Sequence, residues 1–167
     1  MSPERNDQEF AVYNSLNVEK LTETLNARAD RLCTFLLILL GSAVFGSMAS
    51  TFWLGLAVAA IAALQFVCRF GEAAGAARAQ KLRYDSLKGR MSDLTDDVLA
   101  EQYERIHEQD NRPLASIETI AFNKACYMRG QEDECRPLSR FTKLVALVSG
   151  GHPCDVPPRD EKAASVK

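Results

Sequence analysis

The sequence has no charged side chain between Arg31 and Arg69, a gap of 37 residues in a chain of 167 of which 25% are charged. It has only two histidines and none of the phosphate-binding, zinc-protease or nucleophile-elbow motifs that mark common enzyme classes. A net charge of −2 argues against a general nucleic-acid coat. We therefore expect no enzyme, no catalytic residue and no cofactor, and the pair His152 and Cys154 is too little for a metal site.

The uncharged run 32–68 predicts a membrane hairpin. A single helix of this length would measure about 55 Å, whereas the hydrocarbon core of a bilayer is only about 30 Å thick. Small and polar residues at 46–51 break the run, so we expect two transmembrane helices at about 32–48 and 52–68. The alternative is a buried hairpin inside a soluble bundle, but few polar residues remain to cover it. The mean hydropathy of the whole chain, −0.15, does not show that the apolar residues are concentrated at 32–68.

Basic residues flank the hairpin on both sides, and the short connection between the two spans has none. The positive-inside rule then places both termini in the cytoplasm and makes the chain a multi-pass membrane protein. The five cysteines show no paired spacing, which suits a reducing cytosol.

Small residues recur at every fourth position in both expected spans, a spacing that lets helix backbones approach closely in lipid. We expect packing, either between copies or only within one hairpin, through Gly46, Gly55, Ala59 and Ala63. A second stripe on the first span could line a pore and consists of Thr34, Ile38, Ser42 and Phe45. In that interpretation the phenyl ring of Phe45 is a hydrophobic gate. Lone Ser and Thr side chains also bond back to their own backbone, which is the competing interpretation.

The remaining sequence predicts helices and no strand, so the expected fold class is an all-α membrane protein. We expect an amphipathic N-terminal helix over 1–31 that continues into the first span. A cytoplasmic helical bundle over 69–149 is built on an extension of the second span, and the tail 150–167 is expected to be disordered. Pro137 is expected at the start of the last helix. The predicted apolar face of that helix consists of Leu138, Phe141, Leu144, Val145 and Val148.

Charge is segregated after the hairpin, because residues 69–90 carry six basic and two acidic side chains whereas residues 91–118 carry two basic and eight acidic ones. Topology and charge pairing between the two segments explain this pattern. The alternative is an anion site for a nucleotide or oligonucleotide, formed by convergence of Arg78, Lys81, Arg83 and Lys88. The acidic residues around His107, namely Glu104, Glu108 and Asp110, are interpreted as an exposed helix end.

Several short segments follow the hairpin in a distinctive order: the stalk 69–85, Tyr84-Asp85-Ser86-Leu87, the return helix ending at 105–110, Arg112-Pro113, residues 120–123 and Gly130. Together with the amphipathic lead-in and the hairpin, this order over about 10–148 resembles the SLATT family, the SMODS- and SLOG-associating two-transmembrane effector domains. The resemblance implies a homo-oligomeric pore-forming effector in the bacterial inner membrane that acts in anti-phage defence by abortive infection. It also implies control by a neighbouring nucleotidyltransferase-like sensor or by its nucleotide or oligonucleotide product.

Two classes of function therefore stand side by side. In the first, the hairpins form an ion channel or pore in the lipid bilayer under control of a nucleotide-type signal. In the second, the hairpin only anchors a helical scaffold for a partner protein, without a pore. A phage-encoded holin-like or exclusion protein is a further alternative.

Overall fold

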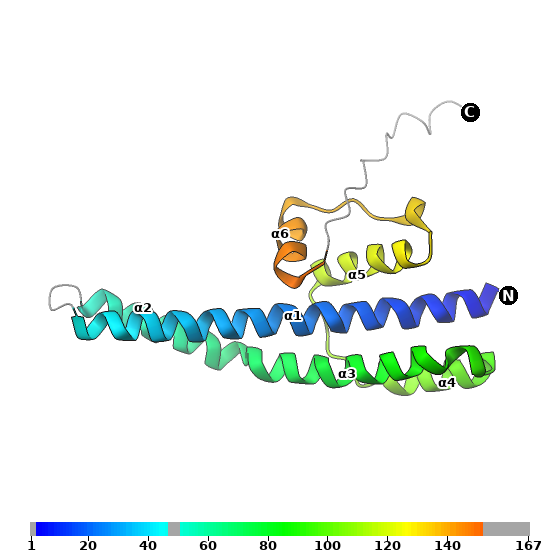
Figure 1. The fold of residues 1–167 in the computed structure, drawn as a ribbon, viewed down its shortest axis with the longest axis horizontal. Helices are drawn as coiled ribbons and strands as arrows, with labels where there is room; N and C mark the ends of the chain where they lie inside the picture. The colour runs from blue at the N-terminus through cyan, green and yellow to red at the C-terminus, as the bar shows by residue number, and fades with distance from the viewer. Residues whose placement is uncertain (1–2, 47–50, 152–167) are drawn as a thin grey trace, which may run out of the picture.

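The computed structural model describes residues 3–46 and 51–151, and these residues form helices and connections without a strand. The all-α prediction is therefore confirmed for this part of the chain. Figure 1 shows the elements. They are α1 (Pro3–Gly46), α2 (Thr51–Cys68), α3 (Phe70–Arg90), the 3-10 turn η1 (Met91–Asp93), α4 (Asp96–His107), α5 (Ala115–Met128), the 3-10 turn η2 (Glu132–Glu134) and α6 (Arg140–Ser149).

The molecule is elongated, with α1 as its long axis (Figure 1). Helix α1 has 44 residues and is therefore about 66 Å long. Helices α2 and α3 return beside it, α4 packs beside α3, and α5 and α6 form a lobe on another side of α1 (Figure 1). The expected lead-in and first span are thus a single helix, because no breaker separates them. Positions 47–48 of that span and the tail from 152 lie outside the described residues.

The connection between α2 and α3, where the sequence predicts a continuous extension of the second span, contains a bend. Arg69 has φ 48° and ψ 44°, a left-handed conformation that costs a non-glycine residue about 1 kcal/mol. One helical hydrogen bond ends at the bend and another begins there, since Arg69 N–H donates to Gln65 O at 3.0 Å and Ala73 N–H donates to Arg69 O at 3.0 Å. The chain therefore changes direction at Arg69, between the end of α2 and the start of α3.

Two apolar clusters stabilise the part of the molecule that is distant from the α1–α2 connection. One joins α1 to α5 and α6 through Val18, Leu21, Ile117, Ile120, Ala121, Val145 and Ala146. The other joins α1 to α3 and α4 through Val12, Leu87 and Leu99. Helical spacing predicts apolar faces that include Leu99 in α4 and Ile117, Ile120 and Ala121 in α5, and these residues are buried. The same predicted faces include Val98, Leu114 and Met128, which are exposed.

The last helix differs from its prediction. It begins at Arg140 instead of Pro137, because the Ser139 hydroxyl accepts a hydrogen bond from Thr142 N–H at 3.1 Å and caps the helix. Of the predicted apolar face only Val145 is fully buried, and Leu138 packs against the core from outside the helix. Phe141, Leu144 and Val148 are exposed, which corrects their assignment to a core-facing surface.

Candidate functional site

The α1–α2 end of the molecule has an apolar surface on both helices. Large exposed side chains cover it, among them Phe35, Ile38, Leu39, Phe52, Trp53, Leu56, Phe66 and Val67. One helical stretch, Phe52–Asp93, is long and apolar enough by length and composition to cross a membrane. Its most apolar window has a mean hydropathy of 1.8, and none of that window is buried. A core helix of a soluble protein has the opposite burial, so this surface needs an apolar partner.

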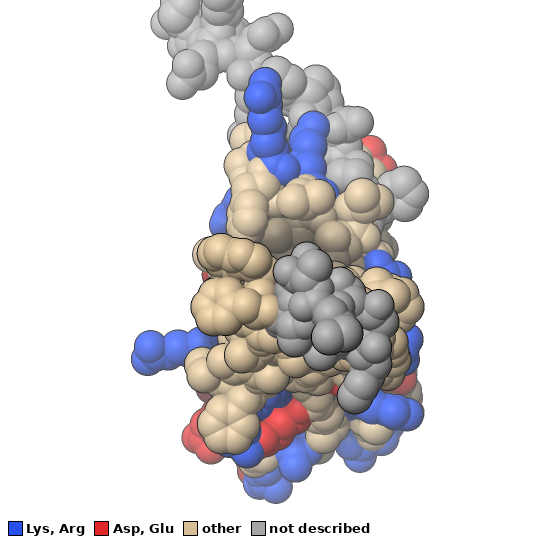
Figure 2. All heavy atoms as spheres, turned by 90° about the vertical axis from the view of Figure 1, so that its left-hand side faces the viewer, with Lys and Arg blue, Asp and Glu red and all other residues tan. Residues whose placement is uncertain are grey.

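Figure 2 looks at this end along the long axis. The surface facing the viewer is predominantly uncharged, and Lys and Arg side chains project around its edge (Figure 2). Acidic side chains reach the edge in fewer places (Figure 2). An uncharged end with a basic margin is the surface that an anionic bilayer attracts.

The predicted pore stripe lies on the exposed side of α1. Thr34, Ile38 and Ser42 are all exposed, whereas the side chain of Phe45 lies outside the described part of the structure. The Ser42 hydroxyl donates to Ile38 O at 2.8 Å, and Thr34 Oγ1 accepts from Gln65 Nε2 at 3.2 Å. Both hydroxyls are therefore bonded within the chain.

The predicted packing residues of α2 do not face α1. Gly55, Ala59 and Ala63 are exposed, and a Cβ placed on Gly55 would meet nothing within 4 Å. The side of α2 toward α1 is marked by Gln65, whose amide also donates to Asp30 Oδ1 at 3.0 Å. Half-buried residues on this side include Leu54, Val58 and Ile61. Gly46 is the last residue of α1. Packing of the small residues against another copy stays a prediction.

The four basic residues of the predicted anion site separate into two groups. Lys81 and Lys88 line a cavity of about 290 Å³ together with Lys20 of α1 and Lys124 of α5. Lys81 pairs with Glu23, and the Lys88 ammonium lies 4.8 Å from the centre of the Tyr13 ring. These contacts tie the lysine cavity to α1.

The other two basic residues do not line that cavity. Arg83 donates to Gln80 Oε1 at 3.1 Å and also to the side chain of Gln109 after α4. Arg78 is exposed. The structure therefore places Lys81 and Lys88 with two lysines that sequence reasoning missed, because those come from helices far away in the sequence.

A larger polar cavity of about 520 Å³ lies between α1, α4 and α5. Its lining includes Glu19, which is 3% exposed, and the guanidinium groups of Arg112 and Arg136. Burial and, to a smaller extent, the nearby charge of Asp110 together raise the pKa of Glu19 to about 7. The sequence gives no signal for this carboxyl, because Glu19 lies in an amphipathic helix where a solvated acid is the ordinary expectation.

Asp110, which also lines the polar cavity, is the centre of a hydrogen-bond network. It accepts from Tyr84 Oη at 2.6 Å and from Gln80 Nε2 at 2.7 Å, and His107 Nδ1 lies 2.9 Å from it. Burial raises the pKa of Tyr84, and the carboxylate it bonds raises it further. Glu104 and Glu108 are exposed as predicted for a helix end, but Asp110 is a structural partner of α3 and not a solvated charge. In residues 3–46 and 51–151 no group of three or more His, Cys, Asp or Glu side chains could hold a metal ion.

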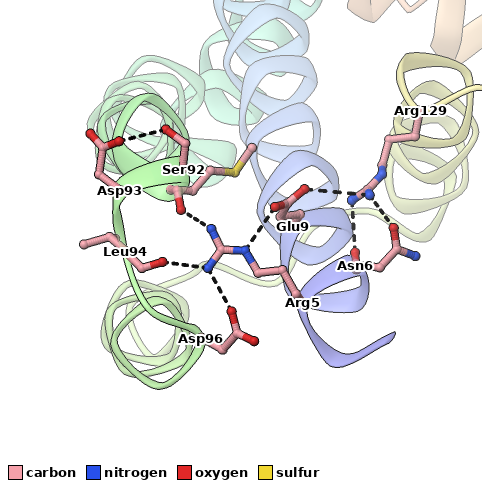
Figure 3. Close-up of polar contacts among 9 residues, drawn as sticks. Arg5, Asn6, Glu9, Ser92, Asp93, Leu94, Asp96 and Arg129 are labelled. Carbon is pink, nitrogen blue, oxygen red and sulfur yellow. Dashed lines mark hydrogen bonds and ion pairs between the residues drawn. The ribbon is translucent and has the colours of Figure 1, made fainter. Parts of the chain in front are cut away.

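Two arginines bind the end of α1 farthest from the α1–α2 connection (Figure 3). Arg5 forms an ion pair with Glu9 at 3.0 Å, donates to Leu94 O at 2.9 Å and reaches Asp96 Oδ1 at 3.1 Å. Arg129, the residue that follows α5, donates to Asn6 O at 3.0 Å (Figure 3). Helices from distant parts of the sequence are thereby held to one end of α1.

No family model, no curated protein and no solved structure matches the chain. The site therefore has to be interpreted from its own geometry.

Proposed function

We propose that the chain is an inner-membrane pore effector of a bacterial anti-phage system, in which the apolar part of α1 and the whole of α2 cross the bilayer. The observation that supports membrane insertion is the exposed apolar surface on both helices, which no other part of the chain covers within the described residues. The assignment to a pore-forming anti-phage effector rests on the resemblance in sequence. The basic margin supports an orientation with both termini in the cytoplasm. The resemblance to the SLATT family agrees with this assignment.

The pore would form between copies of the chain. Gly55, Ala59 and Ala63 are exposed on α2, and Thr34, Ile38 and Ser42 are exposed on α1, so both surfaces are free to meet another copy. Close approach at small residues is how helices associate in lipid, where apolar burial supplies no net drive. In this arrangement α2 packs against a neighbouring copy while the stripe on α1 faces the axis.

The signal would act on the helices outside the bilayer. The lysine cavity and the polar cavity both contact α1, which continues directly into the first span. A nucleotide or oligonucleotide, or the sensor that makes it, shifts the pore only if it binds one packing of these helices better than another. Four lysines, against Asp85 in the lining and Glu23 paired with Lys81, leave the lysine cavity with the net positive charge that phosphate groups require.

Ion flux from liposomes that contain the purified chain tests this proposal. Wild-type protein should release ions, and the rate should change when the right nucleotide or oligonucleotide is added. A variant in which Ile38→Lys places a charge on the stripe should alter flux, whereas Leu82→Lys on the exposed side of α3 should not. Liposomes that stay sealed under every condition, with the hairpin inserted, would refute the pore.

A membrane-anchored scaffold is the second candidate, and one observation favours it. The hydroxyls of Ser42 and Thr34 are already bonded within the chain, as in membrane helices that line no pore. A scaffold would tolerate an unrelated apolar hairpin in place of residues 32–68 and would show no flux.

A further inference from the structure

Helix α6 buries small and polar residues and exposes its large apolar ones, which is the reverse of a helix that packs only on its own protein. Its buried residues include Thr142 and Ser149 beside Val145 and Ala146. Its largest apolar side chains are exposed: Phe141 by 67%, Leu144 by 58%, Leu147 by 68% and Val148 by 40%. Four large apolar side chains on one exposed helix face indicate a partner that covers them.

The position of α6 along α1 identifies that partner. Arg28 Nη1 donates to the carbonyl oxygens of Leu147 at 3.3 Å and Val148 at 2.7 Å, so the last turn of α6 is fixed beside Arg28. Arg28 precedes the uncharged run at Leu32 by one helical turn, about 6 Å along the axis. The headgroup layer on each side of a bilayer is roughly 5–8 Å thick. With the hairpin inserted, the end of α6 lies at headgroup depth.

The orientation of α6 and its charges fit the same partner. The helix runs across the long axis, at the end of the α5–α6 lobe that is nearer to α2 (Figure 1). When the molecule is seen from its apolar end, the part of this lobe that faces the viewer is uncharged, and basic side chains project above it (Figure 2). Basic residues at this helix are Arg140 and Lys143 on α6 itself and Arg28 of α1, which bonds its last turn. Apolar residues with basic neighbours are typical of helices that lie in a membrane interface.

We propose that the exposed face of α6 lies in the headgroup–acyl boundary of the leaflet through which the hairpin enters, with a preference for anionic lipid. This inference rests on insertion of the hairpin, and it adds a second membrane contact outside the two spans. Helix α6 packs on Ile120 and Ala121 of α5 and with them on Leu21 of α1. Because α6 is packed on α5 and α1, its contact with lipid fixes the distance of the lysine cavity and the polar cavity from the bilayer.

Quenching of tryptophan by brominated lipids tests the proposal on the full chain in vesicles of phosphatidylethanolamine and phosphatidylglycerol. The sequence has a single tryptophan, Trp53, so the wild type reports insertion of the hairpin by itself. In a Trp53→Phe background, Leu144→Trp places the probe on α6, and Phe141→Trp provides a second probe with a smaller change of side chain. Leu82→Trp is the matched control, because Leu82 on α3 is also 58% exposed.

We expect shallow brominated lipids to quench both α6 probes about as strongly as they quench Trp53, and to leave the Leu82→Trp probe unaffected. Exchange of phosphatidylglycerol for phosphatidylcholine should weaken quenching at α6 more than at Trp53. Quenching of Trp53 without quenching of either α6 probe would overturn the proposal while hairpin insertion stands. A blue-shifted α6 probe that bromines do not quench would assign the face to a second copy or a protein partner and would overturn it as well. Absence of quenching at Trp53 would overturn the insertion on which both proposals rest.

Discussion

The buried carboxyl of Glu19 makes the free energy of unfolding fall as pH rises. An ionised acid paired on the surface has the opposite effect. Glu19 is 3% exposed in the wall of the polar cavity, and Asp110 places a second negative charge near it. Other charged or titratable groups around the cavity are Arg112 and Arg136 after α4 and η2, His107 on α4 and Glu118 on α5. We predict that Glu19→Gln stabilises the protein at neutral and alkaline pH.

The magnitude follows from the pKa of Glu19, which is raised from 4.5 to about 7 in the folded chain. Below pH 4.5 the carboxyl is protonated in both folded and unfolded states and adds no pH dependence. Between pH 4.5 and 7 only the folded state holds the proton, so the free energy of unfolding falls as pH rises. Each unit of pKa corresponds to about 1.4 kcal/mol, so the total loss above pH 7 is about 3 kcal/mol.

Thermal unfolding of the full chain in detergent, followed by circular dichroism from pH 4.5 to pH 8, measures this effect. The stability of Glu19→Gln relative to wild type should grow by about 3 kcal/mol across the range. Glu101→Gln is the control, because the Glu101 side chain is 68% exposed and pairs with Arg105 on the surface. Parallel pH profiles for wild type and Glu19→Gln would refute the assignment of a buried, protonated carboxyl.

Further substitutions at four residues test other parts of the structure. Gly151→Ala should destabilise the protein by about 1–3 kcal/mol in the same melts, because its Cβ would lie 2.6 Å from the stiff, buried side chain of Ile120. Gly75→Ala in α3 meets nothing within 4 Å and should instead stabilise by about 0.5–1 kcal/mol. Tyr84→Phe should cost about 1.5–3 kcal/mol at neutral pH, since it removes a donor to a carboxylate; a change near zero would contradict that bond. Gly55→Leu should reduce oligomer size in chemical crosslinking, whereas Gly75→Leu should leave oligomer size unchanged.

The spacing of apolar residues predicts the helices whose apolar face is buried in the core, such as α4 and α5. Leu99 in α4 and Ile117, Ile120 and Ala121 in α5 are buried as their spacing predicts. These positions follow from helical period alone, because a stripe of apolar residues three and four apart has to face something apolar.

Periodicity does not say what covers a face, and α6 illustrates the difference. Its residue spacing predicts an apolar stripe, but Phe141, Leu144 and Val148 are exposed, whereas Val145 and the smaller Ala146 lie in the core cluster with residues of α1 and α5. A pattern of residue types contains the period of a helix and not the shape of the space beside it.

Contacts between distant segments could not be predicted at all. The hydrogen bonds of Arg5 span up to 91 residues and that of Arg129 spans 123. The lysine cavity likewise joins Lys20 and Lys124 to α3. These contacts depend on which helices become neighbours after folding. A single sequence does not show which pairs of distant residues will meet.

Conductance of the wild-type chain across a planar bilayer tests the central claim most directly. The pore proposal predicts discrete current steps of uniform size, whose frequency changes when the signalling nucleotide is added on the side of the outer helices. A silent bilayer would contradict it if Trp53 in the same preparation is quenched by brominated lipid, because the hairpin would then be inserted without forming a pore.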